Sequence, residues 1–373
     1  MSDDPADLRR TLETLRTLGP LDATAMVAAT AHLDALTKPP GSLGRLESLA
    51  VQLAGVTGEP RPTFHRRAIV VAAADHGVVD QGVSAYPPDV TSQMVANFLA
   101  GGAAISALAG TVGASVIVVD AGVAAAVPPA DGAAKARLIS APIRAGTSDM
   151  SVGPAMSRDE ALRAIALGLD VADRLVHDGV DLLGVGEMGI GNTTAASAVT
   201  AAMTGLPAER VTGRGTGIDD ARYRHKVDVV TRALERNRPG PADPIGVLAM
   251  VGGFEVGVLV GLMLGAAASR VPVILDGFIT GAAALLAAGL APGIEGRFVA
   301  AHRSVEPGHA VVLERLGLRP LLELDLRLGE ATGAALAMSL VDAAVAVRDG
   351  MATFDAAGVS GPAADAEHVE ETR

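Results

Sequence analysis

The chain contains no cysteine and no tryptophan, and only 2% of its 373 residues are aromatic. Without cysteine, disulfide bonds, thiol catalysis and Cys-ligated metal sites are excluded. With so few aromatic residues, a ring-shaped ligand would lie mostly between aliphatic and methionine side chains. A cysteine-free chain fits a cytoplasmic protein, which is the location we expect.

Basic residues are few relative to acidic ones. The chain has 30 Lys and Arg against 42 Asp and Glu, a formal net charge of −12. No segment combines clustered Lys and Arg with aromatic residues, the pattern that nucleic-acid binding requires. We therefore expect small-molecule substrates and no nucleic-acid partner. A small phosphorylated ligand is compatible with this charge, because backbone N–H groups can hold it.

Long uncharged runs are rare as well. The most membrane-like run, residues 277–294, contains several glycines and a proline, and Asp276 precedes it. A bilayer crossing needs about 20 predominantly apolar residues. This run therefore predicts a buried strand, turn and helix rather than a membrane span.

Apolar residues, in contrast, make up 49% of the chain, in short Val- and Ile-rich runs between longer helical patterns. The short runs predict strands at 68–74, 114–120, 181–186, 271–275 and 297–301. Helical spacing predicts two helices within 6–37 and others at 45–56, 89–110, 158–178, 192–204, 220–237, 255–268, 278–289, 307–316 and 330–348. This alternation is typical of a parallel sheet covered on both faces.

The predicted fold is therefore α/β, a doubly wound parallel sheet in a Rossmann-like three-layer arrangement, with a small helical domain from the N- and C-terminal segments. We place the large substrate-binding domain at 60–325 and the small domain at 1–59 plus 326–354. Residues 355–373 lack periodicity and predict a disordered acidic tail. Such sheets bind ligands at the carboxyl ends of their strands.

Glu330 is the first candidate catalytic residue. It ends the sequence Arg-Leu-Gly-Glu, at a glycine-flanked turn just before an apolar helix. A half-buried carboxylate there would have a raised pKa and could act as a general base near neutral pH. The alternative is an acidic residue that only complements the helix dipole.

A glycine-rich segment, residues 184–194, follows a predicted strand and opens a helix. Its first glycines match the dinucleotide pattern G-x-G-x-x-G, but no acidic residue ends a second strand about 20 residues later. The segment therefore favours a mononucleotide phosphate at the helix start, where Asn192 or Thr193 can be the cap. A tight turn without ligand is the alternative. Glu187 suits a hydrogen bond with a ring N–H better than a phosphate.

Three later features could also hold a ligand. In the loop 212–217, the N–H groups of Gly213 and Gly215 can form an anion site. Lys226 can reach a ligand carboxylate, or it can be an ordinary exposed helical lysine. Ser304 follows the last strand and can donate to a phosphate or simply cap the next helix.

The connection 82–94 is long enough to cover a pocket, with Tyr86 and Met94 as walls. For Met94 the alternative is an ordinary core residue. His76 and His302 follow strands, but no close ligand spacing such as H-x-x-x-H occurs. We therefore expect no metal.

Taken in chain order, these motifs resemble the signature set of the nicotinate-nucleotide–dimethylbenzimidazole phosphoribosyltransferase family. The resemblance runs from about residue 10 to 350. It rests on the segments 38–47 (KPPGSLGRLE), 74–78 (ADHGV), 186–189 (GEMG), 192–194 (NTT), 226–230 (KVDVV), 251–254 (VGGF), 276–278 (DGF) and 327–330 (RLGE).

The resemblance implies phosphoribosyl transfer from nicotinate mononucleotide to 5,6-dimethylbenzimidazole, which gives α-ribazole 5′-phosphate and nicotinate for the lower ligand of cobalamin. It also implies a homodimer without metal or nucleotide cofactor, and Glu330 as the catalytic base. The benzimidazole would contact Glu187, Tyr86, Met94, Lys226 and Leu328. The phosphate and ribose would contact Gly189, Asn192, Gly213, Gly215 and Ser304.

Within 82–94 the sequence departs from the family pattern. Tyr86 and Met94 stand where enterobacterial-type members carry smaller or more polar residues, so the preferred base stays open. Two other functions also stay open. One is a nicotinamide-dependent oxidoreductase, resting on the G-x-G-x-x-G match, and the other is a nucleotide-binding protein without catalysis.

Overall fold

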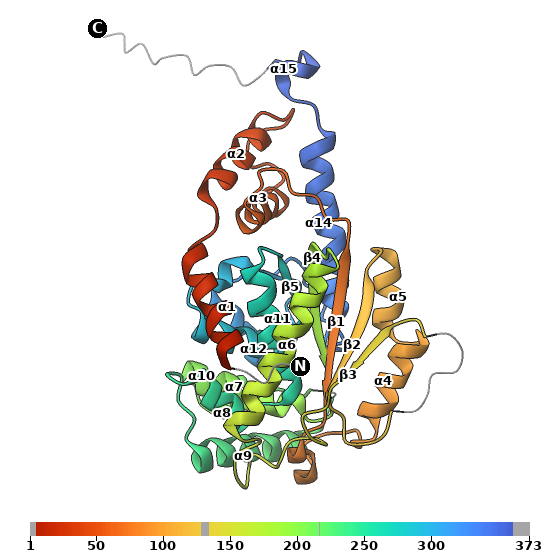
Figure 1. The fold of residues 1–373 in the computed structure, drawn as a ribbon, viewed down its shortest axis with the longest axis vertical. Helices are drawn as coiled ribbons and strands as arrows, with labels where there is room; N and C mark the ends of the chain where they lie inside the picture. The colour runs from red at the N-terminus through yellow and green to blue at the C-terminus, as the bar shows by residue number, and fades with distance from the viewer. Residues whose placement is uncertain (1–4, 128–133, 216, 361–373) are drawn as a thin grey trace. The chain divides into compact units, whose positions relative to one another are not determined.

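A six-stranded sheet forms the centre of the computed structural model, which describes residues 5–127, 134–215 and 217–360. The strand order is β3-β2-β1-β4-β5-β6, and every neighbouring pair is parallel. The strands are β1 (Arg67–Ala74), β2 (Ser115–Gly122), β3 (Arg137–Ser140), β4 (Leu182–Met188), β5 (Val273–Leu275) and β6 (Phe298–Ala300) (Figure 1). The order reverses between β1 and β4, which confirms the predicted doubly wound α/β fold.

The sequence misses one strand, β3. This strand is four residues long, lies at the edge of the sheet and is largely exposed. It therefore lacks the continuous apolar run that marks a parallel strand buried on both faces.

Helices occupy the connections and both ends of the chain. They are α1 (Pro5–Leu18), α2 (Ala23–Asp34), α3 (Arg45–Thr57), α4 (Val90–Ala100), α5 (Ala104–Thr111), α6 (Arg158–His177), α7 (Asn192–Thr204), α8 (Ala208–Val211), α9 (Asp220–Asn237), α10 (Pro244–Val251), α11 (Phe254–Ala268), α12 (Phe278–Leu290), α13 (Pro307–Leu316), α14 (Thr332–Gly350) and α15 (Phe354–Ala357), with 3-10 helices η1 (Gly77–Gln81) and η2 (Ile294–Arg297). The single helix predicted at 89–110 is two helices, because Gly101 ends α4 with a left-handed φ of 80°.

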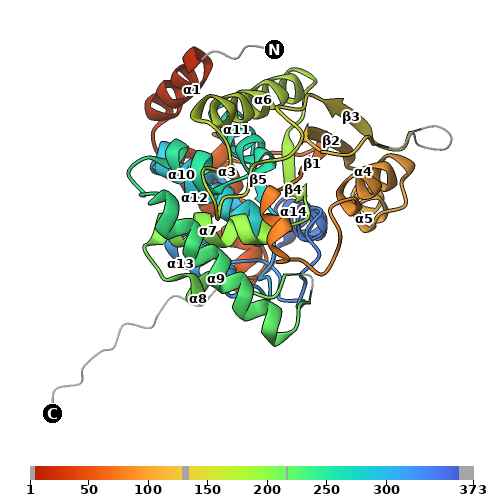
Figure 2. The same ribbon diagram turned by 90° about the horizontal axis from the view of Figure 1, so that it is seen from below.

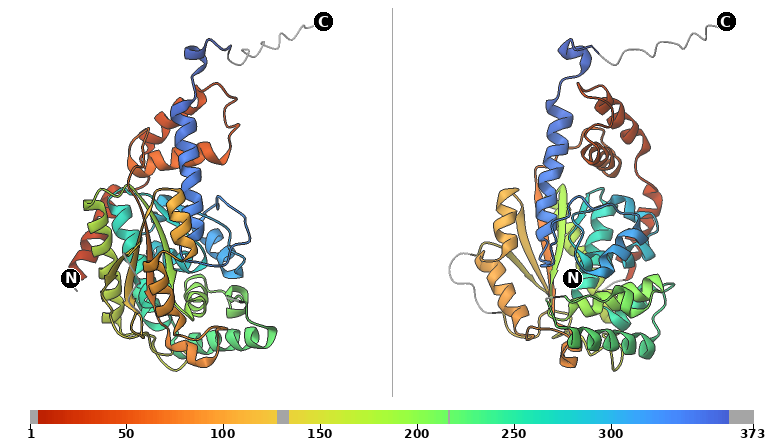
Figure 3. Two further views of the ribbon diagram at one scale, coloured as in Figure 1. Left: turned by 90° about the vertical axis from the view of Figure 1, so that its right-hand side faces the viewer. Right: turned by 180° about the vertical axis from the view of Figure 1, so that it is seen from behind.

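Small residues let α6 and α11 pack closely on one face of the sheet, while α4 and α5 cover the other face of β1 and β2 (Figure 2). A Cβ atom at Gly261 would collide with the carbonyl oxygen of Ile165, and one at Gly168 would collide with that of Val258. Glycine is therefore required on both helices at this crossing. α1 packs against the same two helices (Figure 3).

The first two glycines of the G-x-G-x-x-G match lie inside β4, where they face α14. A Cβ atom at Gly184 would lie 3.1 Å from Cε of Met338, and one at Gly186 would collide with the backbone nitrogen of Ala331. Because these glycines have no side chain, they leave room for α14 and the turn before it to pack on β4. They do not form the phosphate loop after a first strand that the oxidoreductase interpretation requires.

The chain divides into two contact units whose boundaries differ from the expected 60–325 and 1–59 plus 326–354. The large unit holds α1 and residues 64–339, and the small unit holds 22–63 and the segment from Leu340 onward. α1 belongs to the large unit because Leu8 and Leu15 are buried in its core. The turn at Glu330 belongs there because it packs on the glycines of β4.

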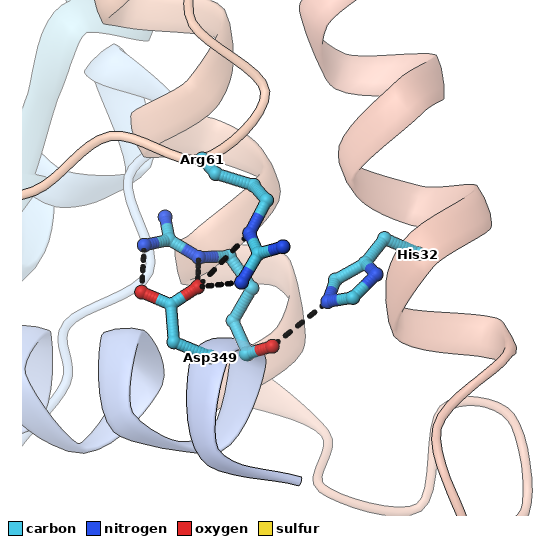
Figure 4. Close-up of polar contacts among 4 residues, drawn as sticks. His32, Arg61 and Asp349 are labelled. Carbon is cyan, nitrogen blue, oxygen red and sulfur yellow. Dashed lines mark hydrogen bonds and ion pairs between the residues drawn. The ribbon is translucent and has the colours of Figure 1, made fainter. Parts of the chain in front are cut away.

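Within the small unit, polar contacts tie the end of α14 to the segments around α2 and α3 (Figure 4). His32 Nε2 lies 2.8 Å from the carbonyl oxygen of Arg348. The Asp349 carboxylate accepts hydrogen bonds from Arg348 Nη2 at 2.6 Å and from Arg61 Nη2 at 2.8 Å. The Arg348 side chain is buried, so Asp349 supplies its counter-charge.

Two segments bear on the predictions for the tail and the membrane. The tail predicted at 355–373 begins inside the helix α15, which Thr353 caps, and residues 361–373 lie outside the described residues. By length and composition alone, Val90–Thr111 could cross a membrane, with a mean hydropathy of 1.4, although Gly101 divides it into α4 and α5. Residues 277–294 contain the mostly buried α12, as the buried-helix interpretation predicts.

Candidate active site at the carboxyl ends of the strands

A cavity of about 100 Å³ opens at the carboxyl ends of β4, β5 and β6. Glu187 reaches it from β4, Asp276 from the turn after β5 and Ser304 from the segment after β6. This is the edge at which parallel sheets bind ligands. A larger hollow of about 980 Å³ lies at the opposite ends of β1 and β2, and its lining contains none of the predicted site residues.

The cavity gathers many of the residues predicted from the sequence. Its lining includes Glu187, Gly189, Asn192, Gly215, Ser304 and Leu328. Glu330 directly follows Gly329, which also lines the cavity. Five predicted residues are not in this lining: Glu330 itself, Lys226, Gly213, half-buried Met94 and exposed Tyr86. Gly213 packs against the carboxylate of Glu306, which does line the cavity.

Glu330 lies in a strained turn. Gly329, Glu330 and Ala331 have φ values of 84°, 61° and 65°, so three consecutive residues are left-handed. For residues with a Cβ atom this conformation costs roughly 1–2 kcal/mol each, and it persists only where the surroundings impose it. Such strain is concentrated at active sites, which adds to the case for a functional Glu330.

The Glu330 side chain is 6% exposed, and its Oε2 has no hydrogen-bond partner among the described residues. Burial raises the pKa of Glu330 to about 7. A buried acceptor that titrates near neutral pH is suited to take a proton from a ring N–H.

Asp276 holds the start of α14 in place. Its Oδ1 accepts hydrogen bonds from the backbone nitrogens of Gly333 at 2.7 Å and Ala334 at 3.2 Å. Burial raises the pKa of Asp276 to about 7, against the effect of these hydrogen bonds. His302 Nε2 lies 3.8 Å from the same oxygen, and burial lowers the pKa of His302.

Glu187 is buried beside these acids. Burial raises its pKa well above the usual range, and the charges of Asp276, Glu255 and Glu330 add to the shift. The Asn192 side-chain amide donates to Glu187 Oε2. Asn192 is the first residue of α7 and a partner of Glu187. Gly191 occupies the cap position at which we expected Asn192 or Thr193.

Lys226 is buried, 1% exposed, which excludes the alternative of an exposed helical lysine. Its Nζ donates to Thr193 Oγ1 at 2.8 Å, at the start of α7. Burial lowers the pKa of Lys226 to about 8, and the nearby Glu306 carboxylate opposes that shift. The lysine therefore places a positive charge close to the cavity rather than on the surface.

A buried ion pair lies behind the cavity. His76 Nε2 is 2.7 Å from Glu255 Oε1. Burial, the largest single effect, acts to lower the pKa of His76, but the charge and hydrogen bond of Glu255 and the charge of Asp75 together raise it. In the described part of the chain, no group of three or more His, Cys, Asp or Glu side chains is arranged to hold a metal ion.

Three acidic residues of this region carried no assigned role in the sequence analysis: Asp276, Glu306 and Glu255. Each had a signal. Asp276 directly follows a strand, Glu306 precedes the proline that starts a helix, and Glu255 is the only charged residue of the apolar α11. What the sequence could not supply was which of them faces the cavity.

Fold and site together are those of an α/β enzyme with a cavity among buried acids at the carboxyl edge of a doubly wound sheet. Residues 18–359 match a family model described as phosphoribosyltransferase. The nicotinate-nucleotide–dimethylbenzimidazole phosphoribosyltransferase of Chloroflexus aggregans is 58% identical, over 93% of this chain and 97% of its own. The same-named protein of a Roseiflexus species is 57% identical, over 94% and 98%.

Solved structures agree with these relatives. A crystal structure of nicotinate-nucleotide–dimethylbenzimidazole phosphoribosyltransferase from Thermus thermophilus matches with a TM-score of 0.85 and 48% identity, covering 91% of this chain and 100% of that one. The chain belongs to the nicotinate-nucleotide–dimethylbenzimidazole phosphoribosyltransferase family.

Proposed function

We propose that the protein transfers the phosphoribosyl group of nicotinate mononucleotide to 5,6-dimethylbenzimidazole, giving α-ribazole 5′-phosphate and nicotinate. The observation that carries the proposal is the buried Oε2 of Glu330, which has no partner among the described residues. Its carboxylate has a pKa of about 7, and the residue directly follows Gly329, which lines the cavity. The names of the relatives, matched over nearly their full lengths, support the choice of substrates.

The chemistry needs one base. One benzimidazole nitrogen attacks C1′ of the ribose while the bond from C1′ to the pyridinium nitrogen breaks, and the bonding pair stays on that nitrogen. The other benzimidazole nitrogen gives its proton to Glu330. Attack opposite the departing nicotinate converts the β configuration to α. A placed base contributes about 10²–10⁴-fold, and the alignment of the two substrates can contribute more.

The remaining roles combine the lining of the cavity with the family resemblance, because Tyr86, Met94 and Gly213 are not in that lining. We assign Glu187, Leu328, Tyr86 and Met94 to the benzimidazole, and Gly189, Asn192, Gly213, Gly215 and Ser304 to the phosphate and ribose. Lys226, which we expected at the benzimidazole, donates to Thr193 at the start of α7. We therefore assign it to an anionic group of the mononucleotide.

A homodimer in the cytoplasm is part of the proposal, on the resemblance of the chain to its family. Light scattering coupled to size exclusion measures the dimer directly. A monomer at the concentrations used for catalysis would contradict that part alone.

The proposal is tested by incubating purified protein with nicotinate mononucleotide, with and without 5,6-dimethylbenzimidazole. We expect nicotinate release and a product of the mass of α-ribazole 5′-phosphate only when the base is present. No release with any azole base would exclude the transfer reaction. Titration with NADH addresses the oxidoreductase alternative, for which we expect unchanged cofactor fluorescence.

A further inference from the structure

A second buried carboxylate belongs to Glu306, one of the residues that line the cavity. The residue directly precedes α13, and its side chain is 7% exposed and does not cap that helix. Oε1 accepts a hydrogen bond from the backbone nitrogen of Gly215 at 2.8 Å. Oε2 is buried and has no partner among the described residues. A buried acceptor without a donor is costly, so a donor on a bound ligand would be favourable.

The substrates offer few donors for this oxygen. The inference rests on the proposed function, in which the ring N–H of the benzimidazole goes to Glu330. The ionised carboxylate and phosphate of nicotinate mononucleotide only accept hydrogen bonds, and its donors are the 2′- and 3′-hydroxyls of the ribose. A carboxylate oxygen suits a hydroxyl donor well, because a charged acceptor gives the stronger hydrogen bond.

We infer that Glu306 recognises the ribose of the mononucleotide, with Oε2 accepting a hydrogen bond from the 2′- or the 3′-hydroxyl. This makes Glu306 a residue that selects ribonucleotides over deoxyribonucleotides.

The surroundings of Glu306 favour a hydroxyl over a phosphate at this point. A phosphate beside Glu306 would meet a like charge, and Glu306 already occupies the Gly215 N–H that a phosphate would use. Lys226 lies nearby, since its Nζ would be 3.4 Å from a Cβ atom built on Gly215. The phosphate is therefore better placed beside Lys226, on donors that Glu306 does not occupy, with the ribose against Glu306.

The test compares nicotinate mononucleotide with its 2′-deoxy and 3′-deoxy analogues at saturating 5,6-dimethylbenzimidazole. The wild-type protein, Glu306→Ala and Glu306→Gln are assayed, with Glu314→Gln as a matched control, because Glu314 is an exposed acid on the same α13. The measured quantity is the ratio of kcat/KM for the ribonucleotide to kcat/KM for each deoxy analogue. Intrinsic reactivity differences between the sugars are common to all variants and cancel.

For one of the two analogues we expect the ratio to fall about 10–100-fold in Glu306→Ala, the range of a hydrogen bond to a charged group. We expect Glu314→Gln to leave it unchanged. In Glu306→Gln, the remaining side-chain oxygen can still accept the hydrogen bond from the Gly215 nitrogen. This variant should therefore show a fall in the same ratio if the alanine variant fails to fold.

Equal ratios in all variants would overturn the inference and leave Glu306 as a support for the backbone at Gly213 and Gly215. That result would leave the proposed function intact, because the wild-type protein would still make product. If the wild-type protein makes no product from any nucleotide, the proposed function and the inference fall together.

Discussion

Asp276 Oδ1 accepts a hydrogen bond from the backbone nitrogen of Gly333 at 2.7 Å, and this contact joins the end of β5 to the first turn of α14. Glu330 lies just before that turn, in its left-handed conformation. Asp276 therefore fixes the backbone that carries the proposed base, and it acts as a positioning residue.

The Asp276 carboxylate should make stability depend on pH. Its pKa in the folded protein is about 7, above the unfolded value of 3.8, so its contribution is fully present below about pH 4 and is lost as pH rises through 7. Asp276→Asn keeps an acceptor for Gly333 without burying a charge. Between pH 5 and 8 we expect its urea-unfolding free energy to gain about 2–3 kcal/mol relative to wild type. Asp276→Ala should instead lose stability at both pH values, and a pH-independent difference for Asp276→Asn would contradict the raised pKa.

Glu330 should set the acid limb of the activity profile. Its pKa of about 7 means that the base is protonated and inactive at lower pH, so kcat/KM should rise with pH up to about 7. Glu330→Gln should lower kcat by at least about 10²-fold and remove this limb. Asp325→Asn is the control, because Asp325 is an exposed acid of the same loop whose φ of 54° asparagine tolerates. An unchanged pH profile in Glu330→Gln would assign the proton to another group.

Much of the fold could be read from the sequence because its signals are local. Short apolar runs mark β1, β2 and β4, and glycines and polar residues follow the strands that reach the cavity. The edge strand β3 was not predicted because an exposed strand has no apolar run. The expected boundary put α1 in the small domain, because periodicity shows that Leu8 and Leu15 share a buried face but not which core receives them.

The site was predictable in its residue types but not in its contacts. Glu330 and Glu187 could be chosen because each stands next to glycine at the end of an element. Asn192 contacts Glu187 only because the turn between them is tightly folded, and Glu306 contacts Gly215 across a long stretch of sequence. No local sequence pattern predicts either contact. The burial of Lys226 likewise depends on how α9 packs on α7.

Lys226 should limit activity at the alkaline side. Its pKa of about 8 means that the positive charge is lost above that pH, and the KM for nicotinate mononucleotide should rise there. Lys226→Met should raise this KM about tenfold or more at pH 7, the effect of losing roughly 1.4 kcal/mol. It should also abolish the alkaline rise. Arg224→Met, on the exposed face of the same helix, controls for the change in net charge. A KM that rises equally in both variants would point to long-range electrostatics instead.

Gly186→Ala should damage both stability and activity. The added Cβ atom would collide with the backbone nitrogen of Ala331 and push away the turn that carries Glu330. Overpacking of this kind costs about 1–3 kcal/mol, measurable by urea unfolding, and kcat should fall together with stability. Gly110→Ala is the control, because Gly110 lies within α5 and its Cβ atom would meet nothing within 4 Å. That variant should be neutral or more stable by about 0.5–1 kcal/mol.

Asp349 should stabilise the small unit through the buried Arg348. The Arg348 guanidinium, followed by that of Arg61, lowers the pKa of Asp349 to about 2. A depressed carboxyl pKa contributes stability that is present above the unfolded value of 3.8 and is lost as pH falls toward 2. Asp349→Asn leaves a buried guanidinium without its counter-charge, and because Asp349 is itself partly exposed we expect a loss of about 1–3 kcal/mol at pH 7. Asp34→Asn, at an exposed acid at the end of α2 in the same unit, should change the unfolding free energy by less than about 0.5 kcal/mol. Equal effects of the two substitutions would show that the Arg348–Asp349 contact adds nothing to the stability of this unit.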